Sequence, residues 1–270
     1  VFFNKPTQYW GERDEGIESM IKAARQNGFE VFLNPKVFIE AVGSPASFNL
    51  KDDATWKKWE NNYSAYLIHY ALIAESNGVA LFSIGSDLDN VVAMRKDFWL
   101  TLIEDIRKIY SGKLTYAASY SGVNQVPFWK ELDYIGINAY YPLSESSTPT
   151  IKELISAWQQ PKNKLKLLSQ TFKKQVIFTE WGYRSIDGCA GNQSKLPNDY
   201  IYEGNANTLS QAIAYACLLT VLNNEPWYGG GFCFRFYATE KAGGTNNNDY
   251  TPQNKLAGVI LKKAYLKNKK

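Results

Sequence analysis

The sequence has 270 residues, with 30 basic and 26 acidic side chains and a formal net charge of +4 at neutral pH. One histidine and three cysteines argue against a zinc site built from several such ligands. They also leave Ser-His-Asp or Cys-His catalysis open only if His69 is the base. Carboxylates are plentiful, and an apolar fraction of 45% is typical of a folded globular chain.

The predicted elements begin with a helix at residues 16–27. Apolar side chains recur there at the period of an amphipathic helix, and Gly28 ends it. The elements that follow alternate in type along the chain. In order they are strand 29–37, helix 56–73, strand 79–84, helix 99–110, strands 114–120 and 134–141, a helix beginning near 154, strand 175–179, helix 209–222, strand 229–237 and helix 256–265.

The predicted strands are rich in Val, Ile and Phe and have no alternating polar face. This pattern favours a parallel sheet buried between helices, in one domain over residues 1–270 because no linker divides the chain. Periodicity alone leaves both an open sheet and a closed barrel possible. Neither G-x-G-x-x-G nor G-x-x-x-x-G-K-[ST] occurs, so the usual phosphate-binding loops are not expected.

Polar residues recur at the carboxyl ends of the predicted strands. They are Asn34, Asp87, Asn138, Glu180 and Arg235. In a (β/α)8 barrel these strand ends form one mouth, which is where active sites are built.

Asp87 and Glu180 each follow an apolar strand, where a carboxylate is costly to desolvate unless it has a partner or a task. Two such groups suit glycoside hydrolysis, in which one carboxylic acid protonates the leaving oxygen and one carboxylate attacks the anomeric carbon. The alternative is that each forms a salt bridge with Arg or Lys at the rim of the barrel.

Three stretches carry a family resemblance. They are residues 99–143, which include Asp133-Tyr134-Ile135-Gly136-Ile137-Asn138-Ala139-Tyr140-Tyr141-Pro142, then Phe178-Thr179-Glu180-Trp181-Gly182-Tyr183-Arg184-Ser185, and Asp249-Tyr250-Thr251-Pro252-Gln253-Asn254-Lys255. With them the chain resembles glycoside hydrolase family 113 from about residue 16 to 264. The resemblance implies a (β/α)8 barrel, a retaining mechanism with two carboxylates, and activity on β-1,4-mannan or mannooligosaccharides. It implies no cofactor and no metal.

Matched by position, the resemblance implies that Glu180 is the nucleophile and that Asp87 stands in the acid/base position. Asn138 and Tyr140 would lie beside the nucleophile and bind it or the sugar. Trp181 and Tyr183 would form sugar-facing walls, with packing beneath a loop as the alternative.

Three departures from the family pattern fall near the predicted mouth. Asp87 replaces the usual Glu, which shortens the reach of the carboxyl group by roughly 1–1.5 Å. Asn34-Pro35-Lys36 stands where the family tends to have Lys-Pro-His, so the substrate-binding cation is expected at Lys36. The last strand carries Phe around Arg235 where the family is rich in Trp. These departures support a second hypothesis, a non-catalytic glycan-binding domain on the same barrel.

The strand count is also short for a closed barrel. Six strands are predicted, and residues 1–4 could be the end of one more. A closed barrel needs eight, because missing strands leave unpaired backbone groups. We therefore expect the barrel in this sequence to lack strand 1, helix 1 and most of strand 2.

Other residues have plainer interpretations. Trp10 is either a sugar platform at the mouth or a cap on the barrel, and His69 is expected on a helix surface. Residues 243–249 are expected to form a flexible rim loop rather than a calcium site, since they lack the 12-residue ligand pattern. The long loop 188–202 is expected to border the cleft.

The expected partner is an oligosaccharide or polysaccharide. The longest nearly apolar run, 212–222, is too short to span a bilayer. The only basic clusters lie at 162–166 and in the tail 262–270, and a tail of this kind is usually a solvated helix end, so no nucleic-acid partner is expected. Oligomeric state stays open. So does the compartment, with a secreted or cell-envelope location favoured.

Overall fold

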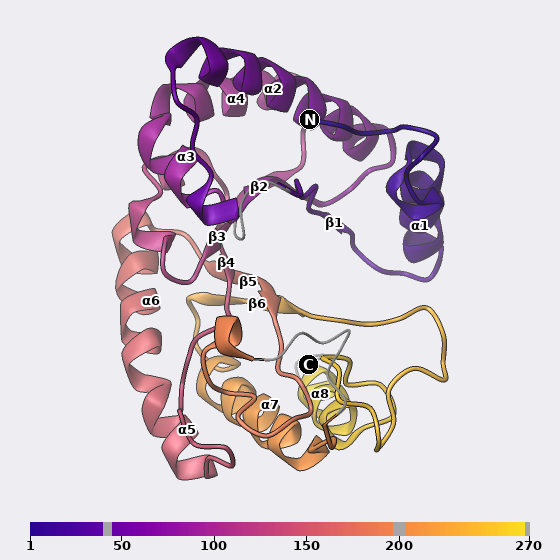
Figure 1. The fold of residues 1–270 in the computed structure, drawn as a ribbon, viewed down its shortest axis with the longest axis vertical. Helices are drawn as coiled ribbons and strands as arrows, with labels where there is room; N and C mark the ends of the chain where they lie inside the picture. The colour runs from indigo at the N-terminus through magenta and orange to yellow at the C-terminus, as the bar shows by residue number, and fades with distance from the viewer. Residues whose placement is uncertain (40–44, 197–203, 268–270) are drawn as a thin grey trace. The chain divides into compact units, whose positions relative to one another are not determined.

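A computed structural model describes residues 1–39, 45–196 and 204–267 and shows the expected alternation of strands and helices (Figure 1). The strands are β1 (Phe32–Leu33), β2 (Leu81–Ser86), β3 (Lys113–Ser119), β4 (Ile135–Asn138), β5 (Val176–Trp181) and β6 (Tyr228–Cys233). Their order in the sheet is their order in the chain. The pairs β1–β2, β2–β3 and β5–β6 are parallel. This sheet is consistent with part of a (β/α)8 barrel.

The helices occupy the predicted regions, except that one short helix is an addition and the helical region predicted from near residue 154 is divided into two helices. They are α1 (Asp14–Gln26), α2 (Asp53–Ser76), α3 (Asp89–Met94), α4 (Lys96–Arg107), α5 (Ile151–Ala157), α6 (Gln159–Phe172), α7 (Thr208–Leu222) and α8 (Leu256–Lys267). Five single-turn 3-10 helices lie at Trp10–Glu12, Pro45–Ser47, Val123–Gln125, Trp129–Glu131 and Gln193–Lys195. The short α3 was not predicted, since six residues are too few to show a helical period.

Six strands within the described residues match the number predicted, but several are shorter than expected. Residues 1–4 form no strand, and β1 covers only two of the residues in 29–37. Pro35 has no N–H to donate to a sheet, which helps to end β1 early. The absence of barrel strand 1, helix 1 and most of strand 2 stays a prediction.

The chain divides into two compact units, Val1–Ile137 and Asn138–Lys270. The single domain expected over residues 1–270 stays a prediction.

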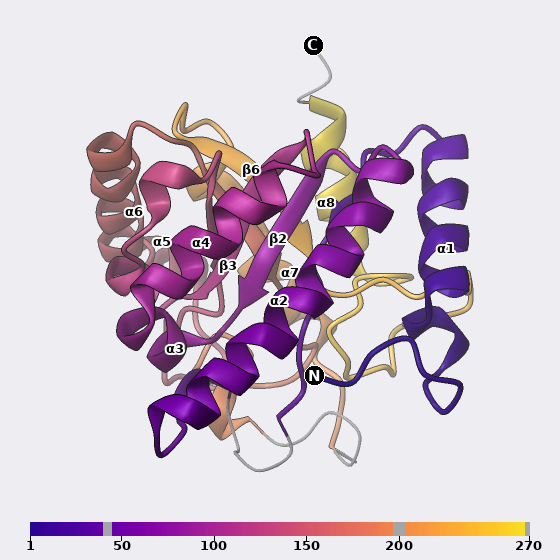
Figure 2. The ribbon, with the colours of Figure 1, turned by 90° about the horizontal axis from the view of Figure 1, so that it is seen from above.

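The core of the first unit is aromatic. Asp52 caps α2 by accepting the Thr55 backbone N–H at 2.8 Å, and the helix then turns an aromatic stripe inward. Tyr63 stacks on Trp59 with ring centroids 4.7 Å apart, and the edge of Trp99 on α4 lies against Tyr63. Figure 2 shows α2 and α4 side by side along β2 and β3. Each such buried ring contributes about 1.5–3 kcal/mol of hydrophobic stabilisation.

The core of the second unit is built around α7. Its helix is buried on most of its surface and packs against α5 and α8. A capping box begins α5, with Thr150 accepting the Glu153 N–H and Glu153 accepting the Thr150 N–H. The pairing of β5 with β6 shifts in register between Val176 and Phe178 and again between Phe178 and Trp181, and Trp181 pairs with Cys233.

Candidate active site

Glu180 is held at the carboxyl end of β5 in the second unit. The hydroxyl of Tyr140 donates a hydrogen bond to its Oε2 at 3.2 Å. The backbone of the same residue is fixed as well, because the Ala139 N–H donates to the Glu180 carbonyl at 2.7 Å. The Glu180 side chain is only partly buried. A half-buried carboxylate oriented by a phenol is chemically suited to act as a nucleophile.

Asn138 lies on the strand that precedes Tyr140. Its Oδ1 accepts a hydrogen bond from Thr179 Oγ1 at 2.8 Å, and both side chains are buried. The structure therefore brings three of the predicted site residues, Glu180, Tyr140 and Asn138, together at the ends of β4 and β5. Their roles toward a sugar stay predictions.

Trp181 and Tyr183 are buried rather than exposed. Their exposed fractions are 1% and 2%, and both rings contact Tyr215 of α7, with centroids at 4.9 and 6.1 Å. Burial raises the pKa of the Tyr183 hydroxyl well above its ordinary value. This burial agrees with the packing alternative for Trp181 and Tyr183 rather than with sugar-facing walls.

Arg235 follows β6 and forms an ion pair with Asp249, a carboxylate to which the sequence analysis gave no role. Its Nη2 donates to Asp249 Oδ2 at 2.9 Å, and the Tyr237 hydroxyl donates to the same oxygen. The guanidinium also lies against the rings of Tyr237 and Phe234, at 5.1 and 5.5 Å from their centroids. Burial disfavours the charged form of Asp249, but the hydrogen bonds from Tyr237 and Arg235 outweigh it and lower the carboxyl pKa.

A buried lysine links the loop after β5 to Asp249. The Nζ of Lys255 donates to Ser185 Oγ at 2.7 Å and to the Asp249 carbonyl at 2.9 Å. Burial lowers the pKa of Lys255 to about 8. Lys255 and Asp249 both stand in the late motif quoted for the resemblance, and that motif was the only sequence signal for them.

Asp87 comes directly after β2 in the first unit. It adopts a left-handed backbone conformation with φ of 52°, and its side chain is partly exposed. Its N–H donates to the Ala117 carbonyl at 3.0 Å, and the Ser86 hydroxyl donates to its Oδ2 at 3.1 Å.

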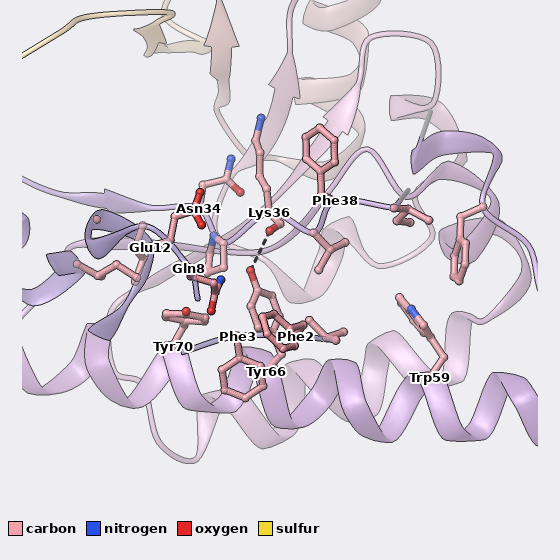
Figure 3. A pocket seen from close by; sticks show the side chains of 18 residues that line it. Phe2, Phe3, Gln8, Glu12, Asn34, Lys36, Phe38, Trp59, Tyr66 and Tyr70 are labelled. Carbon is pink, nitrogen blue, oxygen red and sulfur yellow. Dashed lines mark hydrogen bonds between the residues drawn. The ribbon is translucent and has the colours of Figure 1, made fainter. Parts of the chain in front are cut away.

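Asn34 and Lys36 both line a pocket of about 860 Å³ in the first unit. Figure 3 shows Tyr66 and Tyr70 rising from α2 towards the segment that carries Asn34 and Lys36. The Tyr66 hydroxyl donates to the Lys36 carbonyl at 3.0 Å. Both aromatic and polar side chains line the pocket, including Phe3, Gln8, Glu12, Phe38, Trp59, Tyr66 and Tyr70.

One polar atom of this pocket lacks a protein partner. Within the described residues, Asn34 Oδ1 is buried and accepts no hydrogen bond. Such an atom carries a free-energy cost that a ligand hydroxyl would remove. Trp10 lies in the adjacent 3-10 helix with half of its surface exposed, but it does not line the pocket.

His69 lies on α2 with its side chain partly exposed, and its Nε2 lies 2.8 Å from Asp14 Oδ1 while its ring contacts Phe3. Loop 243–249 is anchored by Asp249, which is buried. The predicted cleft-bordering loop 188–202 is described only to residue 196, and its remainder lies outside the described residues.

Neither a metal nor a membrane segment emerges from the part of the chain that the structure describes. No cluster of three or more His, Cys, Asp or Glu there is arranged to hold a metal ion. In those same residues, every helix is too short or too polar to cross a bilayer.

Comparison with known proteins places the chain in a family. The model of Glycoside Hydrolase Family 113 matches residues 5–255. A GH113 β-1,4-mannanase, solved as a complex, is 28% identical, with 94% of this chain and 79% of that chain covered and a TM-score of 0.80. A GH113 β-mannanase from Alicyclobacillus acidocaldarius, solved in complex with ManMIm, is 22% identical, with coverages of 94% and 78% and a TM-score of 0.81, and it shares the fold.

A β-glucuronidase from Ruminococcus gnavus is 13% identical, with coverages of 92% and 42% and a TM-score of 0.64, so it too shares only the fold. The comparison with curated proteins found no match. Because the family model covers most of the sequence, the chain belongs to glycoside hydrolase family 113, a family of glycosidases.

Proposed function

We propose that the chain is a retaining glycoside hydrolase that cleaves β-linked glycans, with β-1,4-mannan or mannooligosaccharides as its substrates. Family membership and the mannanase neighbours support this substrate class. The observation that carries the mechanism is the hydrogen bond from Tyr140 to Glu180, because it orients the carboxylate at the end of β5.

In this mechanism Glu180 attacks the anomeric carbon and forms a covalent glycosyl-enzyme, while the leaving oxygen receives a proton from Asp87. Asp87 then takes a proton from water, and the hydroxide equivalent releases the sugar from Glu180 with net retention of configuration. Tyr140 keeps the carboxylate oriented through both steps. Asn138 and Arg235 are proposed to bind sugar hydroxyls beside Glu180.

The pocket of the first unit is proposed to bind part of the glycan. The rings of Tyr66 and Tyr70 offer apolar faces for the C–H groups of a sugar, and Asn34 Oδ1 would accept a sugar hydroxyl. Lys36 would donate to a second hydroxyl. The exposed indole of Trp10 is proposed as a stacking surface for a more distant sugar unit.

Kinetics with mannooligosaccharides test the proposal directly. Glu180→Gln and Asp87→Asn should each lower kcat by at least about 100-fold, and NMR of the first product should show the β-anomer. Full activity in Glu180→Gln, or an α-anomer as first product, would contradict the mechanism.

The second candidate is a glycan-binding protein without catalytic activity. The shorter side chain at Asp87 favours it, because a misplacement of ~1 Å at a catalytic group can cost ~100-fold in rate. Calorimetric binding of mannopentaose, with no product after prolonged incubation, would support this candidate over the enzyme.

A further inference from the structure

The end of β2 is irregular immediately before Asp87. Ser83 pairs with Thr115, but the next pair is Ser86 with Ala117, so β2 uses one more residue than β3 over this stretch. The Ser83 hydroxyl donates to the Gly85 carbonyl at 2.8 Å within the bulge. A bulge of this kind bends a strand and changes the direction of the side chains that follow it.

The two peptides after the bulge are tied to β3. The Asp87 N–H donates to the Ala117 carbonyl at 3.0 Å, and the Leu88 N–H donates to the hydroxyl oxygen of Tyr116 at 2.8 Å. Leu88 and Tyr116 are both fully buried. The Tyr116 hydroxyl therefore holds the peptide group that directly follows the left-handed Asp87.

A third contact with β3 involves Asp89, the residue after Leu88. The Ser119 hydroxyl at the end of β3 donates to Asp89 Oδ2 at 2.6 Å, and the Gly122 N–H donates to Ser119 Oγ at 2.8 Å. Burial raises the pKa of Asp89, against the opposing effect of the Ser119 hydrogen bond. Since α3 begins at Asp89, this contact joins the first residue of α3 to the end of β3.

Two glycines provide the space for these contacts. A Cβ at Gly85 would lie 3.0 Å from the Tyr116 ring, and a Cβ at Gly122 would lie 2.6 Å from the Asp89 carboxyl group. Neither glycine has a positive φ, so the backbone conformation does not require glycine at either position. The room they leave for Tyr116 and Asp89 is the physical reason for glycine here.

We propose that Tyr116, Ser119 and Asp89 are positioning residues that fix the direction of the Asp87 carboxyl group for proton transfer to the leaving oxygen. The inference rests on the proposed function, in which Asp87 is the general acid. It also accounts for Asp in place of Glu, because Asp tolerates the left-handed conformation better than a longer side chain does. Without these hydrogen bonds, the peptide group after Asp87 could rotate and the Asp87 carboxyl group would move.

Tyr116→Phe tests the proposal, because it keeps the ring over Gly85 and removes only the oxygen that accepts the Leu88 N–H. For mannopentaose, whose leaving group needs a proton, kcat/KM should fall about 10- to 100-fold. For a dinitrophenyl β-mannobioside, whose leaving group needs none, kcat/KM should fall less than about threefold. A purely structural role would lower both values equally. Asp87→Asn provides the reference pattern, with a still larger difference between the two substrates.

Tyr110→Phe is the matched control. Tyr110 is equally buried, and its hydroxyl donates to the Val79 carbonyl at 2.8 Å near the opposite end of the same strands. This variant should retain both rates. Ser119→Ala is a second test variant, to be used if Tyr116→Phe folds poorly. It removes the hydroxyl that donates to Asp89 from a less buried position, and it should show the same dependence of kcat/KM on the substrate.

The outcomes separate this inference from the proposed function. Suppose that Asp87→Asn lowers kcat/KM for mannopentaose far more than for the dinitrophenyl substrate, as expected. If Tyr116→Phe and Ser119→Ala then keep the wild-type kcat/KM values, or lower kcat/KM equally for both substrates, the positioning role is wrong and the proposed function stands. If wild-type protein cleaves neither substrate, the proposed function is wrong and the positioning role is wrong with it.

Discussion

The ammonium group of Lys255 lies 2.7 Å from the hydroxyl oxygen of Ser185, and both side chains are buried in the second unit. The ammonium also donates to the Asp249 carbonyl. No carboxylate oxygen lies within ion-pair distance of it among the described residues. Burial without a close countercharge is the reason that the pKa of Lys255 falls to about 8.

The lowered pKa of Lys255 gives a testable dependence of stability on pH. Lysine in an unfolded chain titrates near pH 10.5, so between pH 8 and 10 the unfolded chain binds a proton that the folded chain has released. The contribution of Lys255 to the free energy of unfolding therefore rises with pH in this window. In urea titrations, the stability of wild type relative to Lys255→Met should increase from pH 7 to pH 9.5. A constant difference would contradict the lowered pKa.

The three cysteines are expected to be unreactive in the folded chain. Burial raises the pKa of the Cys189 and Cys233 thiols to about 12, and it raises that of Cys217 as well. The thiolate is the reactive form, so a disulfide reagent at pH 8 should label the native protein very slowly. In denaturant the same reagent should label three thiols per chain. Fast labelling of one thiol before unfolding would show that its burial is incomplete.

Asp87→Glu is expected to destabilise the chain although it restores the usual family residue. Asp87 has a φ of 52°, a conformation that Asp and Asn tolerate better than other residues with a side chain. The free energy of unfolding of the Asp87→Glu variant should therefore be lower than that of the Asp87→Asn variant by ~1 kcal/mol. Chemical denaturation of the two variants gives the comparison, and equal stability would mean that the backbone relaxes at this position.

Gly85→Ala should destabilise the first unit. The new Cβ would lie 2.8 Å from the Tyr63 hydroxyl and 3.0 Å from both the Trp99 and Tyr116 rings, which are all buried. Overpacking of this kind costs about 1–3 kcal/mol. Gly11→Ala is the control, since its Cβ would meet only the flexible end of Met20 at 3.8 Å. The measurement is the midpoint of chemical unfolding. An equal midpoint for Gly85→Ala and for the Gly11→Ala control would show that the aromatic rings can shift.

Local patterns in the sequence predicted most of the elements but not their limits. The helix period and terminal glycines located α1, α2 and α4, because these signals act over a few residues. The extent of β1 and β6 was overestimated, because apolar runs continue past the last residue that finds a partner strand. Pairing between strands depends on residues far apart in the chain and is invisible to such patterns.

The same difference applies to the candidate site. The strand-end pattern singled out Asp87 and Glu180, and the elimination of histidine chemistry strengthened the case for paired carboxylates. Asp249 and Lys255 stand in the late motif of the resemblance, but the motif does not show their partners. The contacts of Tyr116 with Leu88, of Asp249 with Arg235 and of Lys255 with Ser185 join residues far apart in the chain, so local patterns could not predict them.

The sequence by itself determined the family resemblance, the order of strands and helices, and the polar residues at strand ends, because composition, period and motif are properties of neighbouring residues. Only the tertiary structure decided that Trp181 and Tyr183 are packed inside the second unit, that Asp87 is left-handed, and that Tyr140 donates to Glu180. Those features arise from hydrogen bonds and packing between segments separated by tens of residues, which form only when the chain is folded.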